Sequence, residues 1–187
     1  MKKKIIWLII YSLVKHLPVS YCWIGGTLYK KIRLFVCSHI FEYCGQNVNV
    51  EKGADFGFGR GIRIGDNSGL GINCRIPEGS IIGNDVMMVP NCYIFDRNHI
   101  FERTDIPMIE QGSTKSVPIV IDDDVWIGRD VSIMAGRHIS KGTIIAACSV
   151  VTKDFPPYSI IGGNPAKLIR SRIDEKNSDK MIILQKT

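Results

Sequence analysis

The chain has 187 residues, a length that suits one domain with a substantial core. Its six cysteines include no CxxC pair, which argues against a zinc or redox site of that type and favours a reducing cytoplasm. The net charge of +6 lies entirely in residues 1–44, which hold seven Lys and Arg against one acid. No recognised nucleic-acid-binding motif accompanies this charge, so nucleic acid is not an expected partner.

Residues 1–44 are predicted to be a helical segment outside the main fold. An apolar run at residues 5–10 follows a Lys-rich start, but no small-x-small cleavage site follows and the run is too short to span a bilayer. Apolar residues also recur at helical spacing from Leu28 to Ile40. Two interpretations stay open: peripheral contact with an anionic membrane surface, or packing on the first coil or in a subunit interface.

A six-residue repeat dominates the rest of the chain. Ile121 is followed, at six-residue steps, by an aliphatic residue each time up to Val151, and the fifth position of each block is mostly small or β-branched. A helix needs a period near 3.6 and a strand a period of 2, so this repeat fits neither as a continuous element. It predicts a β-solenoid in which one apolar side chain per block points into a narrow prism.

The same repeat runs from Ile64 to Ile94 in another phase. The step from Ile94 to Ile121 is 27 residues, which is not a multiple of six, so a segment of roughly residues 97–118 is inserted and leaves the prism. Long excursions from a rigid scaffold often carry function. We therefore expect a solenoid over residues 45–161 with a protruding loop at 97–118.

The repeat ends at Pro156 and Pro157. Beyond it, two glycines and Asn164-Pro165 precede AKLIRSR, and a proline in that place suits the first turn of a helix. Residues 162–187 are accordingly predicted to be a C-terminal helix and tail. The helix would cover the open end or side of the prism, which otherwise exposes strand edges.

Four motifs occur in fixed order along the repeats: NHIF at 98–101, DDVWIG at 123–128, SVVTKDFPP at 149–157 and GGNPAKLIR at 162–170. With them the chain resembles the hexapeptide-repeat O-acetyltransferases of the galactoside, maltose and capsular-polysaccharide type, over roughly residues 45–173. The resemblance implies a left-handed parallel β-helix, here of about five coils. It also implies a homotrimer with sites between subunits and acetyl-CoA as the donor.

A sugar hydroxyl is a poor nucleophile at neutral pH, so its acetylation needs a base, and histidine titrates in the right range. His99 matches the catalytic histidine of the family. The resemblance implies that His99 is the general base in a direct transfer within a ternary complex, without a Ser or Cys nucleophile. Asp96 could orient the imidazole or could serve a turn.

The resemblance also maps the donor-binding positions onto this chain. They are Arg129, Ala147, Thr152, Lys153, Lys167 and Arg170. Trp126 is added as a donor-binding candidate because we expect it to pack near the site or the subunit seam, although an aromatic residue in a solenoid is often only structural. Backbone groups along one side of a solenoid can pair with the amides of the pantetheine arm, and the cations suit the coenzyme's phosphates. On the predicted helix, Lys167 and Arg170 would share one face. No metal is expected.

Acceptor contacts cannot be carried over, because galactoside-type members have an asparagine where this chain has Gly69. The acceptor candidates are therefore drawn from the neighbourhood of the repeat and the loop root. They are Asp96, Asn98, Asn73 and Arg75.

Taken together, these features predict an acetyl-CoA-dependent O-acetyltransferase of the cytoplasm, free or peripheral at the inner face of the membrane. Its expected acceptor is a sugar hydroxyl of a surface-polysaccharide precursor. A xenobiotic acetyltransferase of the streptogramin type is the alternative, and a non-enzymatic scaffold would not explain the NHIF and GGNPAK motifs together. A γ-class carbonic anhydrase needs three zinc-binding histidines, whereas only His99 and His138 lie in the solenoid region.

Overall fold

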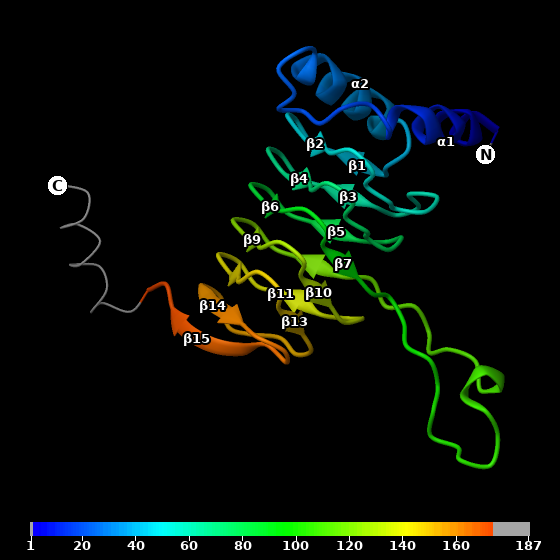
Figure 1. Ribbon diagram of the computed structural model, residues 1–187, viewed down its shortest axis with the longest axis vertical. Coiled ribbons are helices and arrows are strands. Elements are labelled where there is room, and N and C mark those ends of the chain that lie inside the picture. Colours follow the sequence, from blue (N-terminus) through cyan, green and yellow to red (C-terminus); the bar gives the residue numbers. More distant parts are fainter. Residues whose placement is uncertain (1, 174–187) are drawn as a thin grey trace.

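The structure, a computed structural model, describes residues 2–173 of the chain. Two helices, α1 (Lys2–Val14) and α2 (Gly26–Ser38), lie across one end of a column of short strands (Figure 1). The chain then descends turn by turn to an antiparallel pair, β14 and β15, at the other end. Both helices fall within the segment 1–44 for which helices are predicted.

The strands are mostly two residues long, and each forms one step of a parallel wall. Their bounds are β1 (Tyr43–Cys44), β2 (Asn49–Val50), β3 (Arg63–Ile64), β4 (Gly69–Leu70), β5 (Ile81–Ile82), β6 (Met87–Met88), β7 (Tyr93–Ile94), β8 (Val120–Ile121), β9 (Trp126–Ile127), β10 (Ser132–Ile133), β11 (His138–Ile139), β12 (Ile144–Ile145), β13 (Val150–Val151), β14 (Ser159–Gly162) and β15 (Lys167–Ser171). The sheets run β1-β3-β5-β8-β11, β2-β4, β13-β10-β7 and β15-β14-β12-β9-β6. Winding through about six turns, one more than expected, they make a left-handed parallel β-helix, the fold expected from the repeat and the family resemblance.

The residue that opens each six-residue block points into the prism. All twelve such residues, from Ile64 to Ile94 and from Ile121 to Val151, are at most 7% exposed. Buried serines at the fifth position are satisfied by the backbone, since Ser68 Oγ donates to the carbonyl of Gly83 at 2.6 Å. The prediction drawn from the period is confirmed.

Asparagine and aspartate stand at the corners, where the chain bends sharply. Asn47, Asn67 and Asp85 occupy equivalent corners of successive turns, with φ of 56°, 55° and 57°. These residue types tolerate the left-handed conformation better than other non-glycine residues. Their side chains also link the turns, because Asn47 Nδ2 donates to Asn67 Oδ1 at 3.1 Å and Asn67 Nδ2 to Asp85 Oδ1 at 3.0 Å.

Neighbouring isoleucines of β5 offer a test of this packing. Ile82 is 2% exposed and Ile81 is 45% exposed. Ile82→Val is expected to lower the free energy of unfolding by about 0.5–1.5 kcal/mol, because it removes a methyl group from a closed core. The matched Ile81→Val should change it less, and chemical denaturation measures both. Equal losses in the two variants would contradict the assigned inward and outward faces.

A long loop leaves the prism after β7 and returns at β8, carrying a short 3-10 helix, η1 (Met108–Glu110). Figure 1 shows it in green, projecting from the body of the solenoid. The loop does not shift the register of the strands, because Ile82 pairs with Ile121 in adjacent turns. Its two ends meet where the backbone N–H of Val117 donates to the carbonyl of Asp96 at 2.7 Å.

The predicted C-terminal helix at AKLIRSR is wrong. Residues Lys167–Ser171 form strand β15, which pairs antiparallel with β14 after a turn at Gly163–Ala166. The last wall of the solenoid would otherwise end in a row of unpaired N–H and C=O groups, and pairing with β15 satisfies them. The part of the prediction that concerns residues 174–187 lies outside the described residues.

A buried ion pair joins the helical cap, residues 2–38, to the first turn of the solenoid. Arg33 of α2 is fully buried, and its Nη2 lies 3.2 Å from Glu51 Oε2. Its Nε donates to the carbonyl of Val50 at 2.5 Å. Glu51 also accepts hydrogen bonds from the hydroxyl and backbone N–H of Ser20 and from Asn49 Nδ2 at 2.9 Å.

Candidate active site

His99 lies on the outgoing arm of the long loop, close to its root. The two arms are paired there: His99 forms an antiparallel bridge with Ser113, and the backbone N–H of Thr114 donates to the carbonyl of Asn98 at 2.9 Å. The side chain of His99 is exposed, and no hydrogen bond from another residue of the described chain engages its imidazole. The backbone is therefore held in place while the ring stays accessible.

The carboxylate of Asp96 has hydrogen-bond partners other than His99 in the described chain. Its carboxylate accepts hydrogen bonds from Arg97, at 2.8 and 3.0 Å, and from Ser116 Oγ at 2.6 Å. The hydrogen bonds from Arg97 and then Ser116 hold the pKa of the Asp96 carboxyl below its ordinary value. Through its contact with Ser116, Asp96 joins the two ends of the loop.

A groove of about 700 Å³ runs along the solenoid beside the loop root. It is lined by Asp55, Gly57, Phe58, Arg60, Arg75, Ile76, Pro77, Glu78, Tyr93, Ile94, Phe95, Asp96, Arg97 and Ser116. Three arginines and three carboxylates face it, so it offers many polar contacts without a net charge. We call it the acceptor groove, after the role that we propose for it.

Cations stand over aromatic rings in this groove. The guanidinium of Arg75 lies 5.2 Å from the ring centre of Tyr93, and that of Arg60 lies 5.1 Å from the ring centre of Phe58. Arg75 Nε also approaches Asp55 Oδ2 at 3.7 Å. Such pairs fix the guanidinium planes and leave their outer N–H groups available to a ligand.

Of the four predicted acceptor residues, Arg75 and Asp96 line the groove, whereas Asn73 and Asn98 do not. Asn73 stands at a corner with φ of 54°. Phe58 and Arg60 were missed, because they belong to the irregular first coil where the repeat gives no register. Tyr93 could have been found, since it lies three six-residue blocks after Arg75 and pairs with it across adjacent turns.

Arg129 and Ala147, two of the predicted donor residues, lie in adjacent turns at one corner of the prism. The backbone N–H of Cys148 donates to the carbonyl of Arg129 at 2.8 Å. Both side chains are exposed. Trp126 precedes this corner on β9 and is 45% exposed. These three residues therefore share one outer edge of the solenoid.

The other predicted donor residues lie near the end of the chain. Val150 of β13 donates to the carbonyl of Gly163 at 2.9 Å and accepts from the N–H of Ala166 at 2.8 Å. Thr152 follows Val150 by two positions and Lys167 follows Ala166 by one, so this pairing brings the two segments that carry them together. Lys153 and Arg170 are exposed as well, and Lys153 Nζ lies 5.4 Å from the ring centre of Phe155. The common helix face predicted for Lys167 and Arg170 does not exist, because both are on β15.

No protein-family model matches the chain. A putative acetyltransferase of Saccharomyces cerevisiae is 39% identical over 145 residues, which cover 76% of this chain and 72% of the yeast protein. The galactoside O-acetyltransferase of Escherichia coli is 34% identical over 133 residues, which cover 70% of this chain and 64% of that enzyme. The aligned part is thus just under two thirds of the bacterial relative.

A solved structure of similar fold is the hexapeptide-repeat-containing acetyltransferase of Vibrio cholerae O1 biovar eltor, complexed with acetyl coenzyme A. It has a TM-score of 0.74 at 26% identity and covers 92% of this chain and 89% of its own. The chain belongs to the hexapeptide-repeat acetyltransferases. It is an acyltransferase that uses acetyl-CoA, and it is of the galactoside and maltose O-acetyltransferase type.

Proposed function

We propose that the acetyltransferase acetylates a sugar hydroxyl of a surface-polysaccharide precursor, with His99 as the general base. The hydroxyl oxygen attacks the thioester carbonyl, a C–O bond forms and the C–S bond breaks. The hydroxyl proton passes to the imidazole of His99 and from there to the departing thiolate of coenzyme A. The transfer is direct, so no acyl-enzyme forms.

The observation that carries this proposal is the acceptor groove at the root of the loop that bears His99. Its lining residues Asp96 and Arg97 precede His99 by three and two positions. The rings of Phe58 and Tyr93 can cover an apolar sugar face. The guanidinium groups beside them can bind the ring hydroxyls.

The outer edge near Trp126, Arg129 and Ala147 is the proposed place of the donor. Ala147 has a short side chain, which leaves the backbone at this corner within reach of the pantetheine amides. Arg129 on this edge, with Lys167 and Arg170 on β15, offers cations for the coenzyme's phosphates. These residue types fit acetyl-CoA, and Thr152 and Lys153 complete the proposed set.

We further propose a homotrimer, which the family resemblance implies, and a cytoplasmic location. A homotrimer would place the donor edge of one subunit against the His99 loop of another, so that each site lies between subunits. The cytoplasm is supported by the cysteines, because all six are free thiols in the structure. A reducing compartment keeps thiols in that state.

Release of the coenzyme A thiol from acetyl-CoA, measured with a panel of acceptors, tests the proposal. The panel contains free sugars, nucleotide sugars, lipid-linked sugars, a streptogramin and water as the blank. Turnover with one sugar class well above the blank is the expected result. Turnover confined to the streptogramin would assign the enzyme to xenobiotic acetylation, and no acceptor-dependent release would contradict the sugar assignment.

A further inference from the structure

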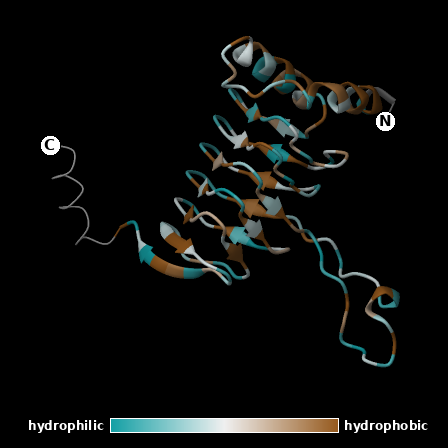
Figure 2. Cartoon of the chain, in the orientation of Figure 1, coloured by the Kyte–Doolittle hydropathy of each residue, from teal (hydrophilic) through white to brown (hydrophobic). Residues whose placement is uncertain are grey.

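Exposed apolar side chains are concentrated in the helical cap. Of 22 large hydrophobic residues that are exposed in the described chain, nine lie in residues 2–38, about a fifth of its length. They are Ile5, Ile6, Ile9, Leu13, Tyr21, Trp23, Ile24, Leu28 and Phe35. Figure 2 shows the apolar colour running along α1. A concentration of this kind marks an interaction surface for a membrane or for another protein.

Helix α1 is apolar on two faces, and one of them packs against the first coil of the solenoid. On its inner face the ring of Tyr11 lies 4.4 Å from that of Phe56, and its hydroxyl donates to the carbonyl of Ala54 at 2.6 Å. The outer face carries Ile5, Ile9 and Leu13 at four-residue steps, with Ile6 beside them. Four-residue spacing places them in one ridge, and they are 52–71% exposed.

The connection between the two helices adds aromatic side chains. Trp23 is 96% exposed, and Tyr21 and Ile24 are 75% and 72% exposed. No residue of the described chain packs on Trp23, so its large apolar ring is left in contact with water. Tryptophan and tyrosine are the side chains that gather at membrane–water interfaces.

The segment that contains this apolar surface also carries an excess of positive charge. Residues 1–44 hold seven basic residues and one acid. Arg33 is buried against Glu51, and Lys4 and Lys30 donate hydrogen bonds to Gly59 and Asn47 of the solenoid. Lys15 lines the cavity between α1 and the first coil, and Lys31 is exposed. In the rest of the chain the charges balance, so the excess is confined to the cap.

We propose that the helical cap binds the surface of an anionic lipid bilayer, with the ridge of α1 and Trp23 inserted at headgroup depth. Apolar burial and attraction of lysines to anionic headgroups act together in this kind of binding. Neither described helix is long and apolar enough to cross a membrane. The contact is therefore peripheral.

The charge argues for a membrane over a second copy of the chain as the occupant. Two caps that met through their ridges would bring together two segments that each carry a net positive charge, and like charges across an interface are unfavourable. An anionic bilayer accepts both the apolar ridge and the cations. The apolar surface and the charge thus favour the same partner.

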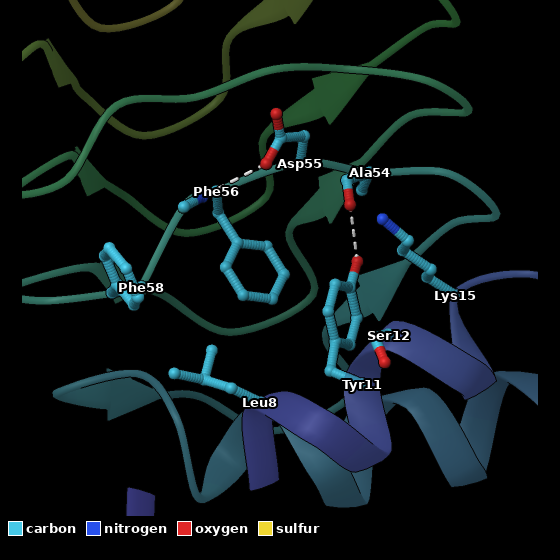
Figure 3. A pocket seen from close by; sticks show the side chains of 9 residues that line it. Leu8, Tyr11, Ser12, Lys15, Ala54, Asp55, Phe56 and Phe58 are labelled. Carbon is cyan, nitrogen blue, oxygen red and sulfur yellow. Dashed lines mark hydrogen bonds between the residues drawn. The ribbon is translucent and has the colours of Figure 1, made fainter. Parts of the chain in front are cut away.

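Binding through the cap would also place the acceptor groove near the membrane. A smaller cavity of about 190 Å³ lies between α1 and the first coil (Figure 3). Asp55, Gly57 and Phe58 line both this cavity and the acceptor groove, so the two adjoin. This consequence for the acceptor rests on the proposed function, whereas lipid binding itself does not.

Co-sedimentation of the full chain with vesicles tests the proposal. Vesicles of phosphatidylcholine with phosphatidylglycerol are expected to bind the chain at low salt, and vesicles of phosphatidylcholine alone much less. The triple variant Ile9→Gln/Leu13→Gln/Trp23→Gln should lower the partition coefficient at least about tenfold. Ile109→Gln, at an 86% exposed site on η1 remote from the cap, is the matched control and should bind as the parent does.

Three outcomes would overturn the proposal: no binding of the parent chain to anionic vesicles, undiminished binding of the triple variant, or a lower oligomer mass of that variant without vesicles. The last result would assign the ridge to contact between copies. Circular dichroism checks that the variants keep their helices. Acetyl transfer to a water-soluble acceptor, measured without vesicles, should be unchanged in the triple variant, so failure of the proposed function is seen separately.

Discussion

Replacing His99 by alanine is expected to lower kcat for acetyl transfer by about 10²- to 10⁴-fold, with the Kd for acetyl-CoA unchanged. The imidazole is the proposed acceptor of the hydroxyl proton, and without it the poorly nucleophilic hydroxyl must attack unaided. Backbone pairing with Ser113 holds this part of the loop, so the substitution should leave the fold intact. Thiol release with the acceptor found by the panel gives kcat, and calorimetry gives the Kd.

His138→Ala is the matched control. His138 lies in β11, is half exposed and hydrogen-bonds through Nε2 to Asp122 Oδ1 at 2.9 Å, with no place in the proposed chemistry. Its variant should keep kcat within a small factor of the parent value. Near-normal turnover of the His99 variant, or an equal loss in the His138 variant, would remove His99 from the role of base.

Arg33→Ala is expected to lower the free energy of unfolding by about 3–5 kcal/mol, because it leaves Glu51 buried without its countercharge. The matched control is Arg63→Ala, which removes the partner of Glu42 from a pair at 3.0 Å that is about half exposed. That change should cost about 0–1 kcal/mol. Chemical denaturation at neutral pH measures both free energies of unfolding. Similar losses in the two variants would contradict the larger contribution to stability expected of the buried pair.

The same network predicts a pH dependence of stability. Burial by itself raises the pKa of Glu51, but hydrogen bonds from Ser20 and Asn49 and the charge of Arg33 outweigh it, so the pKa lies below its ordinary value. The carboxylate therefore stabilises the fold above its unfolded-state pKa, and this contribution is lost as the pH falls through the folded-state pKa. Glu51→Gln should flatten this part of the acid unfolding curve, and an unchanged curve would contradict the assignment.

The solenoid could be predicted from the sequence because its core is periodic along the chain. One side chain in six must enter the prism whatever the conformation of the loops. The positions of Ile127 and Ile133 in the repeat are therefore enough to predict that they are buried. The change of phase between Ile94 and Ile121 located the loop for the same reason. The candidate site was predictable only where a residue stands in register with the repeat, as Arg75 does.

Features that depend on contacts across the fold were not predictable. The segment at Lys167 has the local signals of a helix start. It forms a strand instead, because it pairs with the edge of β14, which would otherwise be unpaired. Phe58 enters the acceptor groove because the first coil is shaped by packing against the helical cap, which no repeat describes. The choice of Asp96 between His99 and Ser116 depends on where the returning arm of the loop lies.

The closure of the long loop upon itself has a consequence for how this enzyme can diversify. Ile82 and Ile121 are neighbours in adjacent turns, and Asp96 and Val117 clasp the two ends of the loop. A loop of another length or composition can therefore be grafted between these ends without disturbing the scaffold beneath. Such a graft would replace His99 and the groove residues Arg97 and Ser116, whereas Arg75 and Tyr93 would stay on the solenoid.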